Sequence, residues 1–338
     1  MIVTRPIRVL VADDSALFRD LLSTLIGAQP GFRVVAVAAN GDDAAAQARR
    51  HRPDVITMDL SMPDSDGFAG IATIMAEVPT PILVLTANRA ERVGFKALAL
   101  GALDILEKPG AAEDLAAYGA VLRHKLRLLA GVPVIRHVRG LQRTRFAGPD
   151  RRARAELVAI GASLGGPHAL ATILKALPLT FPAPVVVVQH IADGFTEGLA
   201  DWLSAEGPLP VRVAKDGDPL QAGRVLLAPS GSHLLVEERE VRLSGGAPVD
   251  TFRPSVTPLF ESAARSFGAR TCGVLLTGMG RDGAAGLLTL RATGATTVAQ
   301  DEATSAVFGM PRAAIELGAV DRILPLEEIA RTLEELTR

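Results

Sequence analysis

Short apolar runs alternate with helix-period segments through about the first 128 residues of the chain, and this alternation restricts its fold more than any other feature. The runs are rich in β-branched residues, and they lie at residues 9–11, 34–37, 55–58, 82–85 and 104–106. Strands that are separated by helices pair in parallel, because a parallel connection needs a crossover of about a dozen residues. Five such units predict a doubly wound α/β domain, a parallel sheet covered by helices on both faces.

A second α/β pattern begins at Leu157 and covers the rest of the chain. Its apolar runs lie at residues 157–160, 185–188, 225–227, 274–276 and 296–298. Two alternating segments, 233–237 and 240–243, flank a turn at Glu238-Arg239 and predict a β-hairpin. We therefore expect a second doubly wound parallel sheet, to which a hairpin is added.

Residues 129–154 separate the two patterns and are predicted to form a linker. Glycine and proline interrupt this stretch, and seven arginines fall between Arg136 and Arg154. We interpret these arginines as solvated side chains of a linker, and a docking surface for a partner is the alternative interpretation. The predicted domains are therefore residues 1–128 and 155–338.

Composition excludes several classes of protein. The chain has 48% hydrophobic and 22% charged residues with a net charge of −1, which lacks the basic balance of a nucleic-acid binder. No stretch approaches the roughly 18 apolar residues that a membrane span needs, and no leader pattern precedes the first strand. The single cysteine, Cys272, excludes an intramolecular disulfide. We expect a cytoplasmic protein that neither binds nucleic acid nor inserts into a membrane.

Polar side chains follow four of the five predicted strands of the first domain. Asp13 and Asp14 come after the first strand, and Asp59, Thr86 and Lys108 come after the third, fourth and fifth. Ligands of open parallel sheets bind at the carboxyl ends of the strands. Carboxylates gathered there repel one another unless a divalent cation such as Mg²⁺ joins them. With a hydroxyl and an ammonium nearby, they predict a phosphoryl site, whereas helix capping would explain only single aspartates.

These residues lie in motifs that resemble those of two-component receiver domains. The matching stretches are residues 11–15, 58–67, 85–87 and 107–109. The resemblance implies that Asp59 accepts a phosphoryl group from a histidine kinase. Ile105 occupies a switch position that is often aromatic in the family, so a swinging aromatic ring cannot carry the signal here.

The same resemblance assigns the remaining roles at this site. It implies that Asp14 and Asp59 ligate Mg²⁺ together with the Ser61 carbonyl, while Asp13 acts on the ion through water. The groups implied to contact the phosphoryl oxygens are the side chains of Thr86 and Lys108.

The second domain opens with an apolar run that ends in a Gly-x-Ser-x-Gly motif, Gly161 to Gly165. Glycines on both sides allow a sharp turn from strand to helix, which exposes the Ser163 hydroxyl and directs backbone N–H groups toward an oxyanion. A Gly-rich turn in which Ser163 caps a helix is the alternative. A serine alone is a poor nucleophile, so a nucleophilic role requires a base and a group that orients the base.

Among six histidines, His190 is the best placed to be this base. It follows four valines and Gln189, at the carboxyl end of a predicted central strand and on the same sheet edge as Ser163. Asp282 lies in a Gly-rich loop after another predicted strand and reaches the same edge. We expect Asp282 to accept a hydrogen bond from His190 Nδ1, which leaves Nε2 to take the Ser163 proton.

With these residues the second half resembles the catalytic domain of the chemotaxis receptor glutamate methylesterases, the CheB family. The matching stretches are residues 161–166, 189–190, 195–196, 228–233, 253–256, 276–283, 300–305 and 309–311. The resemblance implies hydrolysis of glutamate methyl esters on methyl-accepting chemotaxis receptors, with glutamine deamidation as a second activity, and thus sensory adaptation. It also implies backbone oxyanion donors near Leu164 and Met279, and no cofactor for hydrolysis.

The sequence departs from the family pattern at four places. Leu164 stands where threonine is common, residues 191–193 replace a Met-Pro-containing stretch, Trp202 replaces an arginine and Thr257 an aspartate. We expect none of them to touch the three catalytic candidates.

Two other functions are compatible with a receiver. A DNA-binding output would make the chain a transcription factor, but the second half lacks a helix-turn-helix pattern and a basic face. A receptor-binding adaptor without activity is the other alternative.

For the enzyme, we expect the receiver to cover the Ser163 edge until phosphorylation of Asp59 shifts it, because a linker of about 25 residues permits a large rearrangement.

Overall fold

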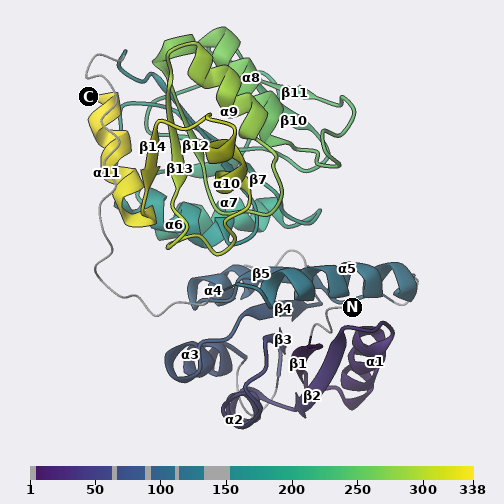
Figure 1. Cartoon of the computed structure of the whole chain (residues 1–338). Helices are drawn as coiled ribbons and strands as arrows, with labels where there is room; N and C mark the ends of the chain where they lie inside the picture. The colour runs from purple at the N-terminus through teal and green to yellow at the C-terminus, as the bar shows by residue number, and fades with distance from the viewer. Residues whose placement is uncertain (1–4, 63–66, 88–92, 111–113, 133–152) are drawn as a thin grey trace. The chain divides into compact units, whose positions relative to one another are not determined.

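A computed structural model of the chain describes residues 5–62, 67–87, 93–110, 114–132 and 153–338. The chain divides into two compact units, Met1–Gly140 and Leu141–Arg338, and each has its own parallel sheet (Figure 1). The division falls within the predicted linker, of which residues 133–152 lie outside the described ranges. Within those ranges, no helix has the length and apolar character to cross a membrane.

The first unit is built on a five-stranded sheet with the order β2-β1-β3-β4-β5, in which every neighbouring pair is parallel. Its strands are β1 (Ile7–Ala12), β2 (Phe32–Ala38), β3 (Val55–Asp59), β4 (Ile82–Thr86) and β5 (Asp104–Glu107). Its helices are α1 (Ala16–Gly27), α2 (Gly41–His51), α3 (Gly67–Glu77), α4 (Val93–Ala99) and α5 (Leu115–Leu129). The five predicted strands and their parallel arrangement are confirmed.

The strand order reverses the direction of the chain between β1 and β3. β1 pairs with β2 on one side and with β3 on the other, so a crevice opens where these strands end. Local capping fixes how the helices start: Ser15, Asn40 and Asp114 accept hydrogen bonds from N–H groups in the first turns of α1, α2 and α5. Local contacts therefore fix where these three helices begin.

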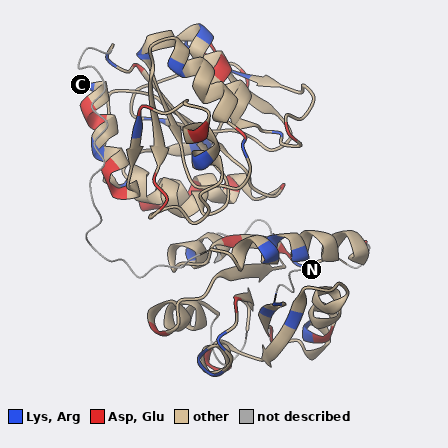
Figure 2. Cartoon of the chain, viewed as in Figure 1, with Lys and Arg blue, Asp and Glu red and all other residues tan. Residues whose placement is uncertain are grey.

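Charge patterning supports the helices as well. Figure 2 shows residues of both signs along α2, whose first turn holds Asp42 and Asp43 and whose last turn holds Arg49 and Arg50. Acidic side chains near the N-terminus and basic side chains near the C-terminus complement the helix dipole. The charged residues of α2 are thus placed where they stabilise the helix.

The second unit is built on a seven-stranded parallel sheet with the order β14-β13-β12-β6-β7-β9-β8. Its strands are β6 (Leu157–Ala162), β7 (Val185–Gln189), β8 (Val211–Val213), β9 (Val225–Leu227), β12 (Thr271–Leu275), β13 (Thr296–Gln300) and β14 (Arg322–Leu324). The predicted hairpin is confirmed as β10 (His233–Glu237) and β11 (Glu240–Ser244). The sequence does not predict the edge strands β8 and β14, because an arginine interrupts or begins each of these three-residue strands and leaves no apolar run.

Strand β6 occupies the centre of this sheet, between β7 and β12. All residues of these three strands are buried. The helices of the unit are α6 (Gly166–Ala176), α7 (Thr196–Glu206), α8 (Val256–Ser266), the short 3₁₀ helix η1 (Gly268–Arg270), α9 (Ala284–Ala292), α10 (Met310–Glu316) and α11 (Leu326–Thr337). Because β6, β7 and β12 are parallel neighbours, the residues that follow them meet at one edge.

Helix α8 begins close to this edge because two glycines leave room for Val256. A Cβ atom added to Gly161 would lie 2.2 Å from Val256 Cγ1, and one added to Gly283 would lie 2.7 Å from the same atom. Both distances are too short for carbon atoms. The N-terminus of α8 can therefore approach β6 only while these positions lack a side chain.

Gly161→Ala should destabilise the chain by about 1–3 kcal/mol, because the new methyl group overlaps the Val256 side chain. Val256→Ala removes both γ-methyl groups, so the double variant should lose less stability than the sum of the two single variants. Denaturant unfolding of the four proteins measures this coupling. Strictly additive losses would show that the close approach is not the cause.

Candidate active site and phosphoacceptor site

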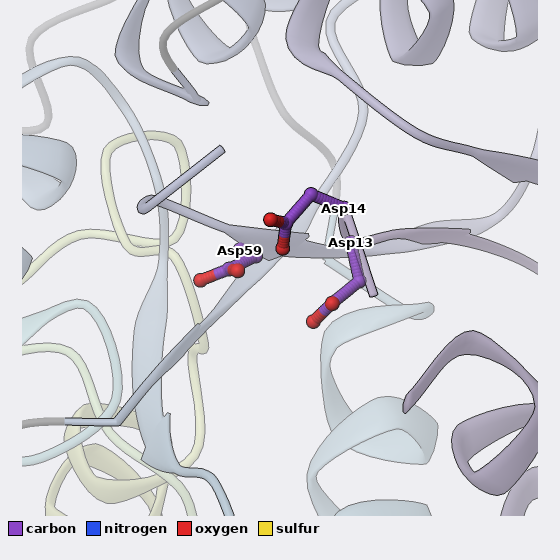
Figure 3. A group of neighbouring side chains, drawn as sticks. All are labelled: Asp13, Asp14 and Asp59. Carbon is purple, nitrogen blue, oxygen red and sulfur yellow. The ribbon is translucent and has the colours of Figure 1, made fainter. Parts of the chain in front are cut away.

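The predicted carboxylates of the first unit lie together. Asp13 and Asp14 follow β1 and Asp59 ends β3, and oxygens of the three groups lie within 4.8 Å of one another (Figure 3). Asp13 and Asp59 are buried, whereas Asp14 is exposed. The β1–β3 crevice therefore holds a concentrated negative charge with one side open to solvent.

Lys108, which follows β5, bridges the two buried carboxylates. Its Nζ atom lies 2.7 Å from Asp13 Oδ2 and 2.7 Å from Asp59 Oδ2. Burial raises the pKa of Asp13, although the bond to Lys108 opposes this effect. Burial also acts to lower the pKa of Lys108, but its hydrogen bonds to Asp13 and Asp59 outweigh burial and raise the pKa. One ammonium thus faces two carboxylates, which leaves the cluster short of positive charge.

This donor set fits a hard divalent cation. Carboxylate oxygens from Asp13, Asp14 and Asp59 are the ligands that Mg²⁺ prefers. Ser61 lies beside the cluster, since its N–H donates to Asp59 Oδ1 at 3.3 Å. Thr86 is buried at the end of β4, the strand next to β3. The predicted roles of the Ser61 carbonyl and the Thr86 hydroxyl remain predictions.

In the second unit, Ser163 lies on a tight turn between β6 and α6. Its N–H donates to Thr277 O at 3.0 Å, and its carbonyl accepts from Gly166 N at 2.8 Å and Gln189 Nε2 at 2.7 Å. Gly165 adopts φ +76°, and an added Cβ there would lie 2.5 Å from Ala306 Cβ. The turn therefore requires glycine after Ser163, as the motif predicts, and its backbone is fixed by three bonds.

The sheet register brings Ser163 and His190 side by side. Ala162 pairs with Gln189, and the His190 N–H donates to Ala162 O at 3.0 Å. Each is the first residue beyond its strand. The loop after β12 approaches from the other side, because a Cβ added to Gly278 would lie 2.7 Å from Ser163 Cβ.

His190 is paired with Asp282, but through the other ring nitrogen from the one expected. Its Nε2 atom lies 2.8 Å from Asp282 Oδ2, and its side chain is 7% exposed. The prediction that Nδ1 faces Asp282 is therefore wrong. Nδ1 is buried and has no hydrogen-bond partner among the described residues, so no bond joins it to Ser163 Oγ. The position of His190 at a strand end does not show which ring nitrogen faces Asp282.

Asp282 is surrounded by donors from the start of α8. Ser255 Oγ donates to Oδ1 at 2.7 Å, Val256 N to Oδ2 at 2.7 Å, and Thr257 Oγ1 to Oδ1 at 2.9 Å. The Gly283 N–H adds a bond to Oδ1 at 2.8 Å. The carboxylate thus sits at a helix N-terminus, where backbone N–H groups and the helix dipole favour negative charge.

These contacts keep Asp282 ionised although it is buried. Burial alone would raise its pKa, but the hydrogen bonds from His190 and Ser255, the charge of His190 and the Val256 N–H lower the pKa to about 2. A carboxylate that stays charged can orient an imidazole and stabilise its protonated form. This is the role that the sequence assigns to Asp282.

Two residues beside the pair were missed or misjudged from the sequence. Thr257 bonds to Asp282 directly, so the expectation that no departing residue touches the catalytic candidates is wrong for this position. Phe252 stacks on the His190 ring, with the centroids 3.9 Å apart. The serine before α8 could have signalled the contacts of Ser255 and Thr257, because an N-cap serine marks a helix start. Nothing in the sequence signals Phe252.

The two predicted oxyanion donors lie on either side of the site. Leu164 follows Ser163 directly, and its carbonyl accepts from Thr277 Oγ1 at 2.9 Å. Met279 lies in the loop after β12 and is 38% exposed. Gly309 packs against this loop, since an added Cβ would lie 2.6 Å from Gly278 O. Both backbones are anchored by their neighbours, while the role of their N–H groups remains a prediction.

Asp282→Asn should lower the free energy of unfolding by about 2 kcal/mol at neutral pH, because an amide cannot accept every bond that the carboxylate accepts. The folded pKa of about 2 lies below the ordinary value of 3.8. The charge therefore stabilises the fold above pH 3.8, and this contribution is lost as the pH falls toward 2.

Denaturant unfolding at stepped pH tests this expectation. The difference between the native chain and Asp282→Asn should be constant above about pH 4 and should shrink below it. Asp193→Asn makes the same chemical change at an exposed position and should show no such pH dependence. A difference that does not vary with pH would contradict the lowered pKa.

Comparison with known proteins identifies the family of each unit. Residues 158–333 match the family model described as CheB methylesterase, and residues 9–118 match the response regulator receiver domain. A protein-glutamate methylesterase/protein-glutamine glutaminase of Anaeromyxobacter dehalogenans is 69% identical over 334 residues, 99% of this chain and 98% of the relative. A protein of the same description from Myxococcus xanthus is 45% identical over 96% of this chain and 92% of the relative.

A solved structure resembles the second unit. The crystal structure of the Thermotoga maritima CheB methylesterase catalytic domain is 39% identical, with a TM-score of 0.52. The match covers 54% of this chain and 100% of that domain. The seven-stranded unit with Ser163, His190 and Asp282 therefore corresponds to a complete domain of known fold.

Proposed function

The chain belongs to the CheB methylesterase family and carries a response regulator receiver domain, and we propose that it demethylates glutamate methyl esters of methyl-accepting chemotaxis receptors. Deamidation of receptor glutamines is its second activity, in keeping with the relatives' description as glutamate methylesterases and glutamine glutaminases. The observation that carries the proposal is the buried His190–Asp282 pair, at 2.8 Å, beside a serine that follows the neighbouring strand.

Ser163 Oγ attacks the ester carbonyl carbon while His190 takes the hydroxyl proton. Because Nε2 is engaged with Asp282, Nδ1 is the nitrogen that accepts this proton. In the proposed reaction the Ser163 hydroxyl bonds to Nδ1 when substrate is bound, since catalytic hydrogen bonds often form or tighten only in that complex. Asp282 stabilises the imidazolium that results.

The tetrahedral intermediate carries a negative charge on the former carbonyl oxygen. The backbone N–H groups of Leu164 and Met279 hold this oxyanion. Methanol leaves with a proton from His190, or ammonia leaves when the substrate is a glutamine. Water, deprotonated by His190, then releases the glutamate from Ser163.

The first unit regulates this activity by accepting a phosphoryl group on Asp59 from a chemotaxis histidine kinase. Asp14, Asp59 and the Ser61 carbonyl would hold Mg²⁺ and Asp13 would act on it through water, and the ion would offset the charge of the phosphoryl group. Lys108 Nζ lies 2.7 Å from Asp59 Oδ2, so it contacts the phosphoryl oxygens together with Thr86. Phosphorylation of Asp59 raises the activity of the second unit. The protein acts in the cytoplasm, and it neither binds nucleic acid nor inserts into a membrane.

Ser163→Ala should lower the rate of methanol release by about 10⁴- to 10⁶-fold, because the variant has no nucleophile. The assay uses methylated receptor membranes and the full chain. Ser244→Ala, the same change on the hairpin strand β11, serves as the control and should keep the native rate. A Ser163→Ala protein that still releases methanol at the native rate would exclude a serine mechanism and favour an adaptor.

Asp59→Asn should abolish the stimulation of methanol release by the kinase, because an amide cannot accept the phosphoryl group. Asp20→Asn changes an exposed aspartate of α1 in the same unit and should leave the stimulation intact. The assay compares methanol release with and without kinase and ATP. Equal stimulation of the native and Asp59→Asn proteins would show that the kinase regulates the enzyme through a residue other than Asp59.

A further inference from the structure

Phe252 lies flat on the imidazole of His190. The ring centroids are 3.9 Å apart and the planes differ by 2°. Phe252 itself is half-buried and comes from the segment before α8, far from β7 along the chain. We propose that Phe252 is a positioning residue that fixes the plane of the His190 ring during ester hydrolysis. This inference rests on the proposed function, in which His190 is the base.

The imidazole needs a second anchor besides Asp282. The bond from Nε2 to Asp282 Oδ2 fixes one ring atom, but Nε2 lies close to the axis of the Cβ–Cγ bond, so this bond alone does not stop the ring from turning about that axis. Nδ1 has no hydrogen-bond partner among the residues described, so no other polar contact limits this rotation. A parallel aromatic ring does limit it, because tilting the imidazole would bring the two rings into collision. Phe252 thus fixes the plane of the ring, and with it the direction in which Nδ1 faces.

The backbone that carries Phe252 is held in a strained turn. Phe252 N donates to Val249 O at 2.9 Å, and Val249 N donates to Phe252 O at 3.1 Å. Between them, Asp250 has φ +47° and Thr251 has φ +74°. Two consecutive left-handed residues define a type I′ turn, which normally contains asparagine or glycine. A β-branched threonine is strained in this conformation, so surrounding contacts must fix the turn.

The residues that follow Phe252 supply such contacts. Arg253 donates through Nη1 to Gly245 O and Gly246 O at 3.3 Å and 3.1 Å. Ser255 N donates to His233 Nδ1 at 3.2 Å, and Ser255 Oγ donates to Asp282. One short segment therefore contacts both members of the catalytic pair, His190 through a ring and Asp282 through a hydroxyl. The strain in the turn is explained if the position of the ring matters for function.

The test is steady-state methanol release by the full chain carrying Phe252→Leu, with methylated receptor membranes as substrate. Leucine keeps the apolar cover but cannot stack, so kcat should fall about 10- to 100-fold while KM stays within about twofold. Phe252→Tyr keeps the ring and should retain at least about half of the native kcat. Phe252→Met supplies a second aliphatic variant in case the leucine protein does not fold.

Phe267→Leu is the matched control, because it makes the same change in the buried core away from His190. It should lower the Tm without lowering kcat. A native kcat for Phe252→Leu or Phe252→Met would overturn the inference, and so would a rise in KM alone, which would assign the ring to substrate binding. Ser163→Ala, assayed in parallel, reports on the proposed function separately: if it kept full activity, the serine mechanism would fail whatever the Phe252 variants did.

Discussion

The buried charge of Asp282 is the constraint on which the second unit depends. A carboxylate that is only 1% exposed must be fully hydrogen-bonded or it will protonate. The start of α8 meets this need with two hydroxyls and two backbone N–H groups, and His190 and the Gly283 N–H complete the set. This explains why α8 must begin so close to β6, and why Gly161 and Gly283 must lack side chains. The close packing of α8 against β6 is therefore what allows Asp282 to stay ionised.

The sequence predicts much of this arrangement because strand ends are easy to locate. Val185 to Val188 can only be a buried strand, so the position of His190 at its carboxyl end follows at once. The Gly-x-Ser-x-Gly motif identifies the turn at Ser163 in the same way, since its geometry requires glycine. Parallel neighbours then bring the two residues together whatever the details of the loops. Backbone pattern is therefore sufficient to identify which side chains meet.

The orientation of side chains, in contrast, cannot be predicted from the sequence pattern. Whether Asp282 approaches Nδ1 or Nε2 depends on how the His190 ring is turned, and the position of His190 at a strand end leaves this open. The contact of Thr257 with Asp282 depends on where α8 begins. The stack of Phe252 depends on two positive φ values that neither Asp250 nor Thr251 favours. Each of these features is set by tertiary contacts that override local preference, so local patterns do not reveal them.

The two carboxylate sites solve the same electrostatic problem in opposite ways. Donors from five residues occupy the lone pairs of Asp282, so its pKa falls to about 2 and its charge needs no further partner. Asp13 and Asp59 share one ammonium, and burial raises the pKa of Asp13. A saturated carboxylate is suited to a fixed task such as orienting His190. An unsaturated pair is suited to binding a cation and then a phosphoryl group, because the charge that it lacks is supplied by the ligand. The incomplete neutralisation of the carboxylates in the receiver site is thus what suits this site to a cation and a phosphoryl group.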